Sequence, residues 1–436
     1  MVIQQFIKRH LAEYVAVRRS ANDPVPSATV RLLERATTCG DPSNGSANVG
    51  CPRCGYEQEV FFSCKVPVFC TRCARRRIKE RIEHLLKSVL ANVPVRHWVF
   101  NLPAQLRFRL IYYRKIRAGL LHKCVRSVIT YLRRKAREVL DLESVRVVFP
   151  AALSFTHLSS GNLKTNVHFH FVVPAGVWVR LERNGPVTFH ELPPPTEDEL
   201  ADIASRVCRS VRKLLIKEGY WQDVLIKSQP DTVQGILTLG QRQRVTFFGA
   251  AAVPGGARRR GAQPFEIHVN NHIERGDHDT LQRLLEYLLS PPLTDDQLEL
   301  LPDGNMRLRF PRPRLDGMDE ETMHPHELLR RMIPIVPTPR SRQYEYHGAF
   351  GPRSSIRKHI VKQIKFLPRC ETPRGLDQSP AGQRARIALH QRTHYEDVSR
   401  CPECGERLEL VLLTTWRSTY KNQAWIKPDH PLAPAA

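Results

Sequence analysis

The sequence predicts an α+β protein: an N-terminal zinc ribbon, a ferredoxin-like (split βαβ) domain with an antiparallel sheet, and a C-terminal basic region with a cysteine knuckle. Three observations predict it. Paired cysteines cluster in residues 39–73, strand and helix patterns alternate over residues 96–289, and the chain of 436 residues carries a net charge of +24. At about 150 residues per domain, this length suggests two to four domains. The expected segments are a helical segment (1–38), a zinc-binding domain with a basic helix (39–92), the split βαβ domain (93–295) and a C-terminal accessory or DNA-binding region (296–436).

Composition narrows the class of protein. Lys plus Arg number 67 against 43 Asp plus Glu, a balance that favours a polyanionic partner, most often nucleic acid, over an anionic membrane surface. No apolar run approaches about 18 residues, so no transmembrane helix is expected. The N-terminus, MVIQQFIKRHLAEY, lacks the apolar core of a signal peptide. We therefore expect a cytoplasmic protein, in which clustered cysteines bind metal rather than form disulfides.

The elements follow in a recognisable order. Helical patterns cover residues 1–38 and 74–90. The split βαβ order β-α-β-β-α-β-α is then expected from strand 96–102, helical text 107–141 with a break at Gly119, strand 145–158 bent at Pro150, strand 166–174, a helix from Thr196 to about Glu218, strand 264–271 and helix 279–289. Thr196 and Glu199 form the capping box that opens the fifth of these elements.

Two C-x₂-C knuckles indicate zinc. Cys51 and Cys54 form the first and Cys70 and Cys73 the second, with the spacing of a zinc ribbon. Four thiolates satisfy tetrahedral zinc and leave no open position, so this zinc is expected to be structural. The sequence leaves open whether the flanking Cys39 and Cys64 are ligands or packed thiols.

A third knuckle, Cys401 and Cys404, stands far along the chain. Its sequence neighbourhood offers Cys370, His390 and His394 as further ligands. Whether this knuckle binds a second zinc stays open at the level of sequence.

A His-x-His triplet marks a second kind of site. On a strand, His168 and His170 present two imidazoles on one face, because side chains alternate. A hairpin centred between residues 162 and 163 would place His157 opposite His168, so that three imidazoles converge. A one-residue slip would turn His157 away, and unpaired surface histidines are the competing interpretation. A second triplet, His324-Pro-His326, contains a proline that argues against a central strand, so we interpret it as a chance occurrence.

Tyr287 lies in the leucine-rich segment LLEYLLSPPL. One interpretation is a core aromatic residue with a satisfied hydroxyl. The other is a nucleophile delivered toward a three-histidine metal site, whose oxygen attacks a phosphodiester and leaves a 5′-phosphotyrosine and a free 3′-OH.

Basic helical segments at 74–90 and 107–141 form the expected footprint for DNA phosphates, with a solvated helix face as the alternative. The residues expected to contact DNA are Arg75, Arg76, Arg77, Arg133, Arg134 and Lys135.

Several blocks in order resemble a known family over roughly residues 30–405. The cysteine segment from Cys39 to Arg77, HWVFNLPAQLR, THLSSGNLKTNVHFHFVV, FEIHVNNHIERGDHDTLQRLLEYLLSPPL, the C-terminal block LRFPRPRLDGMDEETMHPHELLRRMIPIVPTPRSRQYEYHGAFGP and CPECGERL are similar to segments of HUH-endonuclease transposases. Within these, they resemble the rolling-circle transposases of insertion-sequence family ninety-one, which includes the common-region elements. His157 stands where members usually have Gln, and Ser290 stands where they usually have Arg.

The resemblance implies a function. Residues 93–295 would form an HUH nuclease domain that nicks one DNA strand at the element's end through Tyr287 and transfers it to a target. His168 and His170, with His157 as a third ligand, would hold Mg²⁺ or Mn²⁺. Pro291 occupies the position of a second tyrosine found in some relatives, which implies a single-tyrosine enzyme, and Tyr344 and Tyr346 are spare tyrosines on another element.

The resemblance also implies the partners and the alternatives. The partners would be single-stranded element ends and target DNA, and the location would be the bacterial cytoplasm at the nucleoid. A replication initiator or relaxase of the HUH class would share the chemistry, whereas a non-catalytic zinc-ribbon DNA-binding regulator would form no covalent adduct.

Overall fold

Four strands between Val95 and Ile273 pair with Tyr344–Gly348 into one five-stranded sheet in the computed structural model, and the other three strands of that range form a separate small sheet. The structure describes residues 1–66, 68–90, 93–220, 265–313, 317–337, 342–360, 379, 381, 400–414 and 419–421. The chain divides into two compact units: unit 1 contains residues 1–80, 291–339 and 364–436, and unit 2 contains residues 81–290 and 340–363. Each unit is therefore assembled from segments that are far apart in sequence.

Unit 2 contains the elements that carry the histidines and Tyr287. They are η2 (Leu85–Val89), β3 (Val95–Asn101), α4 (Ala104–Tyr112), α5 (Arg114–Val139), η3 (Val145–Val147), β4 (Val148–Phe149), β5 (Ala151–Ser159), β6 (Thr165–Pro174), β7 (Gly176–Val179), β8 (Thr188–Glu191), α6 (Glu197–Lys217), β9 (Glu266–Ile273), α9 (His278–Leu289), β13 (Tyr344–Gly348) and α11 (Arg357–Ile360).

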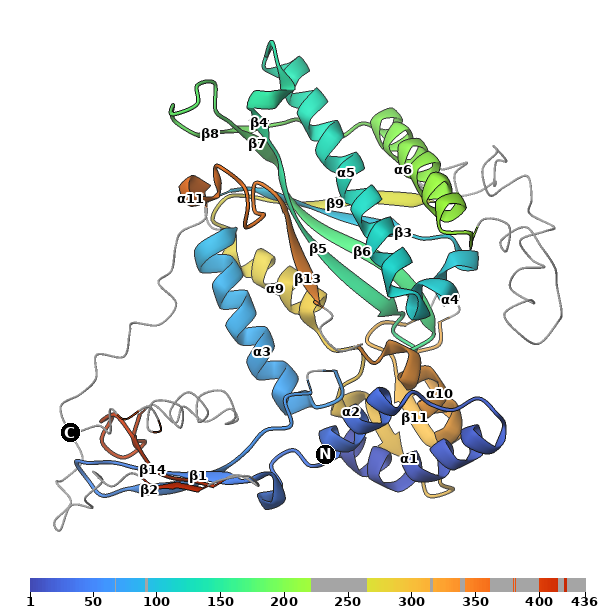
Figure 1. Cartoon of the computed structure of the whole chain (residues 1–436), viewed down its shortest axis with the longest axis vertical. Coiled ribbons are helices and arrows are strands. Elements are labelled where there is room, and N and C mark those ends of the chain that lie inside the picture. The colour runs from blue at the N-terminus through green and yellow to red at the C-terminus, as the bar shows by residue number, and fades with distance from the viewer. Residues whose placement is uncertain are drawn as a thin grey trace. The chain divides into compact units, whose positions relative to one another are not determined.

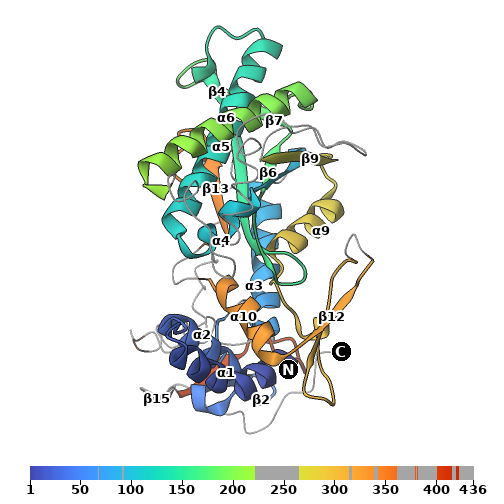
Figure 2. The same ribbon diagram turned by 90° about the vertical axis from the view of Figure 1, so that its right-hand side faces the viewer.

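The main sheet has the order β13-β5-β6-β3-β9, and every neighbouring pair in it is antiparallel. The helices α5 and α6 lie over one face, and α9 lies on the opposite side, as Figure 1 and the turned view of Figure 2 show. The strands alternate in side-chain direction, so one face of β6 sends Val167, Phe169 and Phe171 into the helix-covered core, and the other face carries the histidines. Both faces of β6 are buried, which explains why most of its residues are apolar.

The core of unit 2 fills the space between the sheet and the two long helices. Trp98 and Phe100 of β3 pack there with aromatic residues of β6 and with the apolar faces of α5 and α6. Gly119 lies in the second turn of α5, and a Cβ built there would sit 3.0 Å from Leu214 Cδ2 of α6. The missing side chain therefore permits the close approach of these helices.

Unit 1 contains two small antiparallel sheets and several helices. One sheet has the order β15-β14-β1-β2, and the other the order β10-β11-β12. The elements are α1 (Val2–Ser20), α2 (Ser27–Thr37), η1 (Pro42–Asn44), β1 (Ser46–Gly50), β2 (Glu57–Phe61), η4 (Asp295–Gln297), β10 (Leu298–Leu300), β11 (Met306–Arg309), β12 (Glu320–Met323), α10 (Pro325–Ile335), β14 (Glu409–Thr414) and β15 (Thr419–Lys421). The helix α3 (Thr71–His84) runs from unit 1 into unit 2.

The structure confirms the α+β class and antiparallel pairing and corrects three expectations. The helical text 107–141 breaks at Tyr113, not at Gly119, and the Arg117 guanidinium donates to the carbonyl of Ile111 at the end of α4 at 2.9 Å. Residues 1–38 form two helices, because the segment between them contains Pro24 and Pro26. The stretch 145–158 is a short 3₁₀ turn followed by two strands in different sheets, separated at Pro150.

None of the helices in the described part of the chain combines the length and apolar character that a membrane crossing requires.

Candidate active site and metal centres

Three histidine rings meet on the face of the β5–β6 hairpin that α9 contacts. The strands pair His157 with His168 and Phe155 with His170, which confirms the predicted register. Directly opposite residues point to the same face, so all three imidazoles converge there. Their centroids are 4.5 Å apart for His157 and His170, 4.8 Å for His168 and His170, and 5.2 Å for His157 and His168.

Each ring is oriented by a hydrogen bond from one of its two nitrogens. His168 Nδ1 lies 2.7 Å from the carbonyl of Asn166, and His157 Nε2 lies 3.0 Å from the carbonyl of Leu288. His170 Nδ1 lies 3.0 Å from His97 Nε2, with the two rings stacked. A carbonyl only accepts, so the bonded nitrogens of His157 and His168 carry the proton and the opposite nitrogens keep a lone pair.

The remaining nitrogens suit a metal ion. One donor atom from each of His157, His168 and His170 lies within 4.8 Å of the others. His170 Nε2 is buried and has no hydrogen-bond partner in the described structure, an arrangement that a metal would relieve. Burial lowers the pKa of His168 to about 4 and also lowers the pKa values of His157 and His170. All three rings are thus neutral at pH 7, the form that binds metal.

Tyr287 stands at the rim of this cluster on α9. Its ring centroid lies 5.7 Å from that of His170 and 5.9 Å from that of His157. The helix buries Leu281, Leu285, Leu288 and Leu289, whereas the Tyr287 side chain is 46% exposed. The interpretation of Tyr287 as a core aromatic residue is therefore wrong.

The end of α9 is attached to the histidine cluster by its own sequence. The double proline Pro291 and Pro292 supplies no backbone N–H to the last turn, so the carbonyl of Leu288 needs another donor. His157 supplies it. Asp277 caps the other end of α9, where its carboxylate accepts from the Thr280 N–H at 3.0 Å.

His97 is the residue of this cluster that sequence reasoning missed. It lies on β3, on the same face of the sheet, and burial lowers its pKa to about 4. No spacing signal relates it to His170, since the two are 73 residues apart and meet through strand pairing. Its position in HWVF, in a strand beside the hairpin, is the available signal.

The cysteines form two groups of four in unit 1, and the grouping corrects the expected one. Cys70 and Cys73 lie with Cys39 and Cys64, while Cys51 and Cys54 lie with Cys401 and Cys404. The two knuckles expected to share one zinc are thus in separate clusters.

In the first group the sulfurs are densely packed. Cys39 Sγ lies 3.3 Å from Cys70 Sγ and 3.7 Å from Cys73 Sγ, and Cys64 Sγ lies 3.6 Å from Cys73 Sγ. All four residues are buried. Ionised thiolates at these separations repel one another unless a cation lies between them.

The second group joins distant ends of the sequence. Cys51 Sγ lies 3.5 Å from Cys404 Sγ, and Cys54 Sγ lies 3.5 Å from Cys401 Sγ. Both knuckles read Cys-Pro-x-Cys-Gly, and both glycines, Gly55 and Gly405, have positive φ. The strands β1 and β14 that lead to and from these knuckles pair directly. Cys370, His390 and His394 lie outside the described residues.

The basic residues expected to contact DNA differ in their exposure and in whether they form ion pairs. Arg76 is ion-paired with Glu80, and Lys135 with Glu199 at 2.6 Å. The others are Arg75, Arg133 and Arg134, which are exposed, and Arg77, which is half-buried.

The remaining candidates have hydrogen-bond partners of their own. Tyr344 and Tyr346 are on β13, and the Tyr346 hydroxyl is 3.2 Å from His84 Nε2. His324 caps α10 in unit 1, where its Nδ1 accepts from the His326 N–H at 3.2 Å. That contact gives the second His-x-His triplet a local structural role.

Two family models match the chain. One, described as "Transposase zinc-binding domain", covers residues 6–102, and the other, described as "Putative transposase", covers residues 152–358. Neither a search of curated proteins nor one of solved structures finds a match. The first match contains all four cysteines of the first group and Cys51 and Cys54 of the second. The second match contains the three histidines and Tyr287.

These matches and the cysteine clusters define a DNA transposase with a structural zinc in its N-terminal domain. The chain belongs to the transposases of insertion-sequence family ninety-one. DNA is accordingly its partner.

Proposed function

We propose that this transposase nicks one DNA strand at the end of its element through Tyr287 and transfers the 5′-linked strand to a target, as in rolling-circle transposition. The position of Tyr287 carries the proposal: a half-exposed phenol beside three neutral, pre-oriented imidazoles. The family match favours a transposase over a replication initiator, a relaxase or a regulator.

The fold of unit 2 supports this proposal. Among β3, β5, β6 and β9, the spatial order β5-β6-β3-β9 with α5 and α6 as crossovers is the order of a ferredoxin-like split βαβ sheet. We propose that residues 93–295 form this HUH nuclease domain, with β13 as an added edge strand. The order brings the hairpin and β3 together, and this supports the shared site.

His168 and His170, with His157 as third ligand, would hold a divalent ion, Mg²⁺ or Mn²⁺. A bound ion would polarise the scissile phosphate and offset charge that develops there. An all-imidazole set suits Mn²⁺ better than Mg²⁺, which prefers carboxylates and water. We therefore expect Mn²⁺ to support nicking at lower concentration than Mg²⁺.

The chemical step belongs to Tyr287. Its phenolic oxygen forms a bond to phosphorus, the bond from phosphorus to the 3′ oxygen breaks, the phenol loses its proton, and the leaving oxygen becomes a 3′-OH. The phosphotyrosine keeps the energy of the cut bond for rejoining, so no ATP is needed. His157 holds the carbonyl of Leu288 one residue away, which fixes the end of α9 relative to the hairpin.

We propose that each cysteine group binds one structural zinc: Cys39, Cys64, Cys70 and Cys73 the first, and Cys51, Cys54, Cys401 and Cys404 the second. The phosphate footprint would come from the exposed basic side chains Arg75, Arg133 and Arg134, with single-stranded element ends as substrate. Under this proposal the protein acts at the bacterial nucleoid.

The experiment uses single-stranded DNA of the element's end, labelled at either terminus, with the full chain and Mn²⁺. The expected result is a covalent adduct that retains the 3′-terminal label and releases a 5′-labelled fragment with a free 3′-OH. An adduct that retains the 5′-terminal label, or no adduct with cut DNA, would overturn the proposal.

A further inference from the structure

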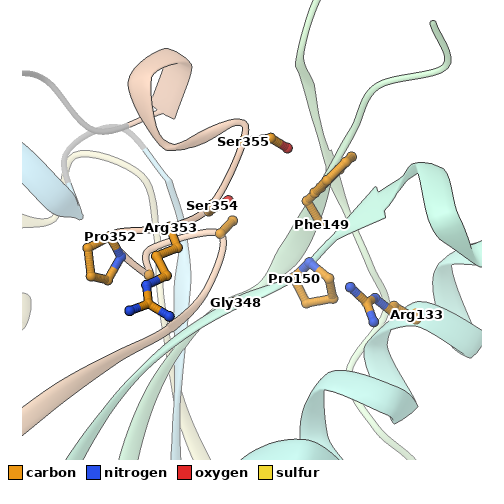
Figure 3. Close-up of a pocket in the computed structure, with 10 residues that line it drawn as sticks. Arg133, Phe149, Pro150, Gly348, Pro352, Arg353, Ser354 and Ser355 are labelled. Carbon is orange, nitrogen blue, oxygen red and sulfur yellow. The ribbon is translucent and has the colours of Figure 1, made fainter. Parts of the chain in front are cut away.

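An open cavity of about 440 Å³ lies at one end of the main sheet, on the side of β5 where that strand begins. Phe149 and Pro150 line it before β5, and Arg133 lines it from α5. Gly348 at the end of β13 and, from the loop that follows, Ala349 and residues 351–355 complete the lining. Figure 3 shows the Arg353 side chain on that loop and the Arg133 side chain on the helix across from it. All of these residues belong to unit 2.

The lining is cationic and offers hydroxyl donors. It contains Arg133, Arg353, Ser354 and Ser355, and it contains no carboxylate among the described residues. A third guanidinium, that of Arg180, donates to Ser355 Oγ at 3.3 Å and lies 5.5 Å from the Phe149 ring centroid. None of the three arginines has an ion-pair partner in the described part of the chain. Arg133 Nε donates to the Val148 carbonyl at 3.3 Å. The remaining N–H groups of guanidinium side chains without an ion-pair partner pair best with phosphate or carboxylate oxygens.

The loop that carries Arg353 is held in one conformation by hydrogen bonds and packing within unit 2. The Ala349 N–H donates to the Pro150 carbonyl at 2.8 Å, and successive turns close it at Gly351 and Ser354. Gly348 has φ +59°, and a Cβ there would lie 2.1 Å from the Pro150 oxygen, so only glycine permits this approach. Phe350 is fully buried against Trp178 beneath the loop. A preorganised loop spends little ordering entropy when it binds.

We propose that this cavity binds a phosphodiester group of a single DNA strand outside the nicking site. The inference rests on the proposed function, since that function supplies the strand. Along β5, Pro150 and His157 are seven residues apart, or about 23 Å at the rise of a strand. A strand that reaches from one to the other spans a few nucleotides, within the site size of about 4–16 nucleotides for proteins that follow single strands.

The test measures binding of a fluorescent single-stranded oligonucleotide by anisotropy over a range of salt, with no Mn²⁺ or Mg²⁺ added so that no nicking occurs. The double variant Arg133→Gln/Arg353→Gln should bind about tenfold more weakly, and its salt slope should fall by about 1.4, the loss of two phosphate contacts. The control is Arg183→Gln, an exposed arginine of the same unit that does not line the cavity. It should match the wild type in both quantities.

The outcomes separate the possibilities. Equal affinity of wild type and double variant, or an equal loss in Arg183→Gln, overturns the proposal. If the double variant melts at a lower temperature, Arg353→Gln alone decides, since this side chain is exposed and should give half the change in slope. Excess inorganic phosphate at matched ionic strength should weaken binding by the wild type and not by the double variant, because it competes for the same guanidinium groups. Equal weakening in both proteins would overturn the proposal.

Failure of this inference and failure of the proposed function remain distinguishable. A chain that forms the covalent adduct while its cavity variants bind DNA normally retains the function and loses the cavity site. A chain whose cavity variants bind weakly and that forms no adduct retains the cavity site and loses the function.

Discussion

At the scale of single residues, the site depends on which ring nitrogen of each histidine is left free. The sequence was sufficient to predict that His157, His168 and His170 converge, because strand periodicity and hairpin register are local properties. It could not predict His97 or the Leu288 carbonyl as their partners, because those contacts depend on how β3 and α9 meet the hairpin.

The first prediction concerns the proposed metal ligands. His168→Ala and His170→Ala should each lower nicking by several orders of magnitude, because each removes an imidazole from the site. Binding of long single-stranded DNA, which rests on many cationic contacts, should hardly change. Gel assays of nicking and anisotropy measure the two effects. His324→Ala is the matched control from the other triplet and should nick normally; damage equal to that of His168→Ala would show that the metal site was assigned to the wrong triplet.

The second prediction concerns His97. His97→Ala removes the hydrogen-bond partner of His170 Nδ1 and should raise the Mn²⁺ concentration needed for half-maximal nicking about 10- to 100-fold. Nicking at saturating Mn²⁺ should recover much of the wild-type rate, which distinguishes a positioning residue from a ligand. An unchanged Mn²⁺ requirement would contradict this role.

At the scale of elements, the helix that carries Tyr287 is held at both ends by side chains. The sequence predicted α9 and its stop at the double proline, because capping and proline effects are local. The sequence prediction placed the helix break within residues 107–141 at Gly119, which is wrong. That glycine serves a tertiary contact instead, because its missing side chain lets α5 approach Leu214 of α6.

The third prediction follows from the N-terminal cap of α9. Asp277→Ala removes the acceptor for the Thr280 N–H and should speed hydrogen exchange in the first turn of α9 about fivefold. Adduct formation should slow, while DNA binding stays constant. Asp277→Asn, which keeps a side-chain acceptor, should have wild-type hydrogen exchange and wild-type adduct formation. Asp303→Ala, which removes a similar contact to the Asn305 N–H in unit 1, is the control and should leave α9 unaffected.

At the scale of the whole molecule, two clusters of thiols organise unit 1, and one of them ties residues near the N-terminus to residues near the C-terminus. Spacing alone suggested a pairing of adjacent knuckles, and the structure pairs Cys51 and Cys54 with Cys401 and Cys404 instead. Sequence separation of about 350 residues hides this contact. The shared pattern Cys-Pro-x-Cys-Gly is the signal that could have revealed it.

The fourth prediction tests this pairing. The purified chain should retain two zinc ions after dialysis, and Cys401→Ser should lose one, as should Cys51→Ser. Because zinc binding contributes about 10 kcal/mol or more to folding of such sites, both variants should lose soluble protein to a similar extent. Elemental analysis of zinc per chain measures the effect. A Cys401→Ser variant with two zinc ions and normal solubility would contradict the pairing.

The identity of the nucleophile is the central claim, and Tyr287→Phe tests it most directly. The substitution removes one hydroxyl from a half-exposed side chain, so the fold should be kept and the affinity for DNA should stay within about a factor of three of the wild-type value. With element-end DNA and Mn²⁺, the variant should form no covalent adduct on a denaturing gel, and the wild-type adduct should map to the peptide that contains Tyr287. Adduct formation by Tyr287→Phe at the wild-type level would contradict the account.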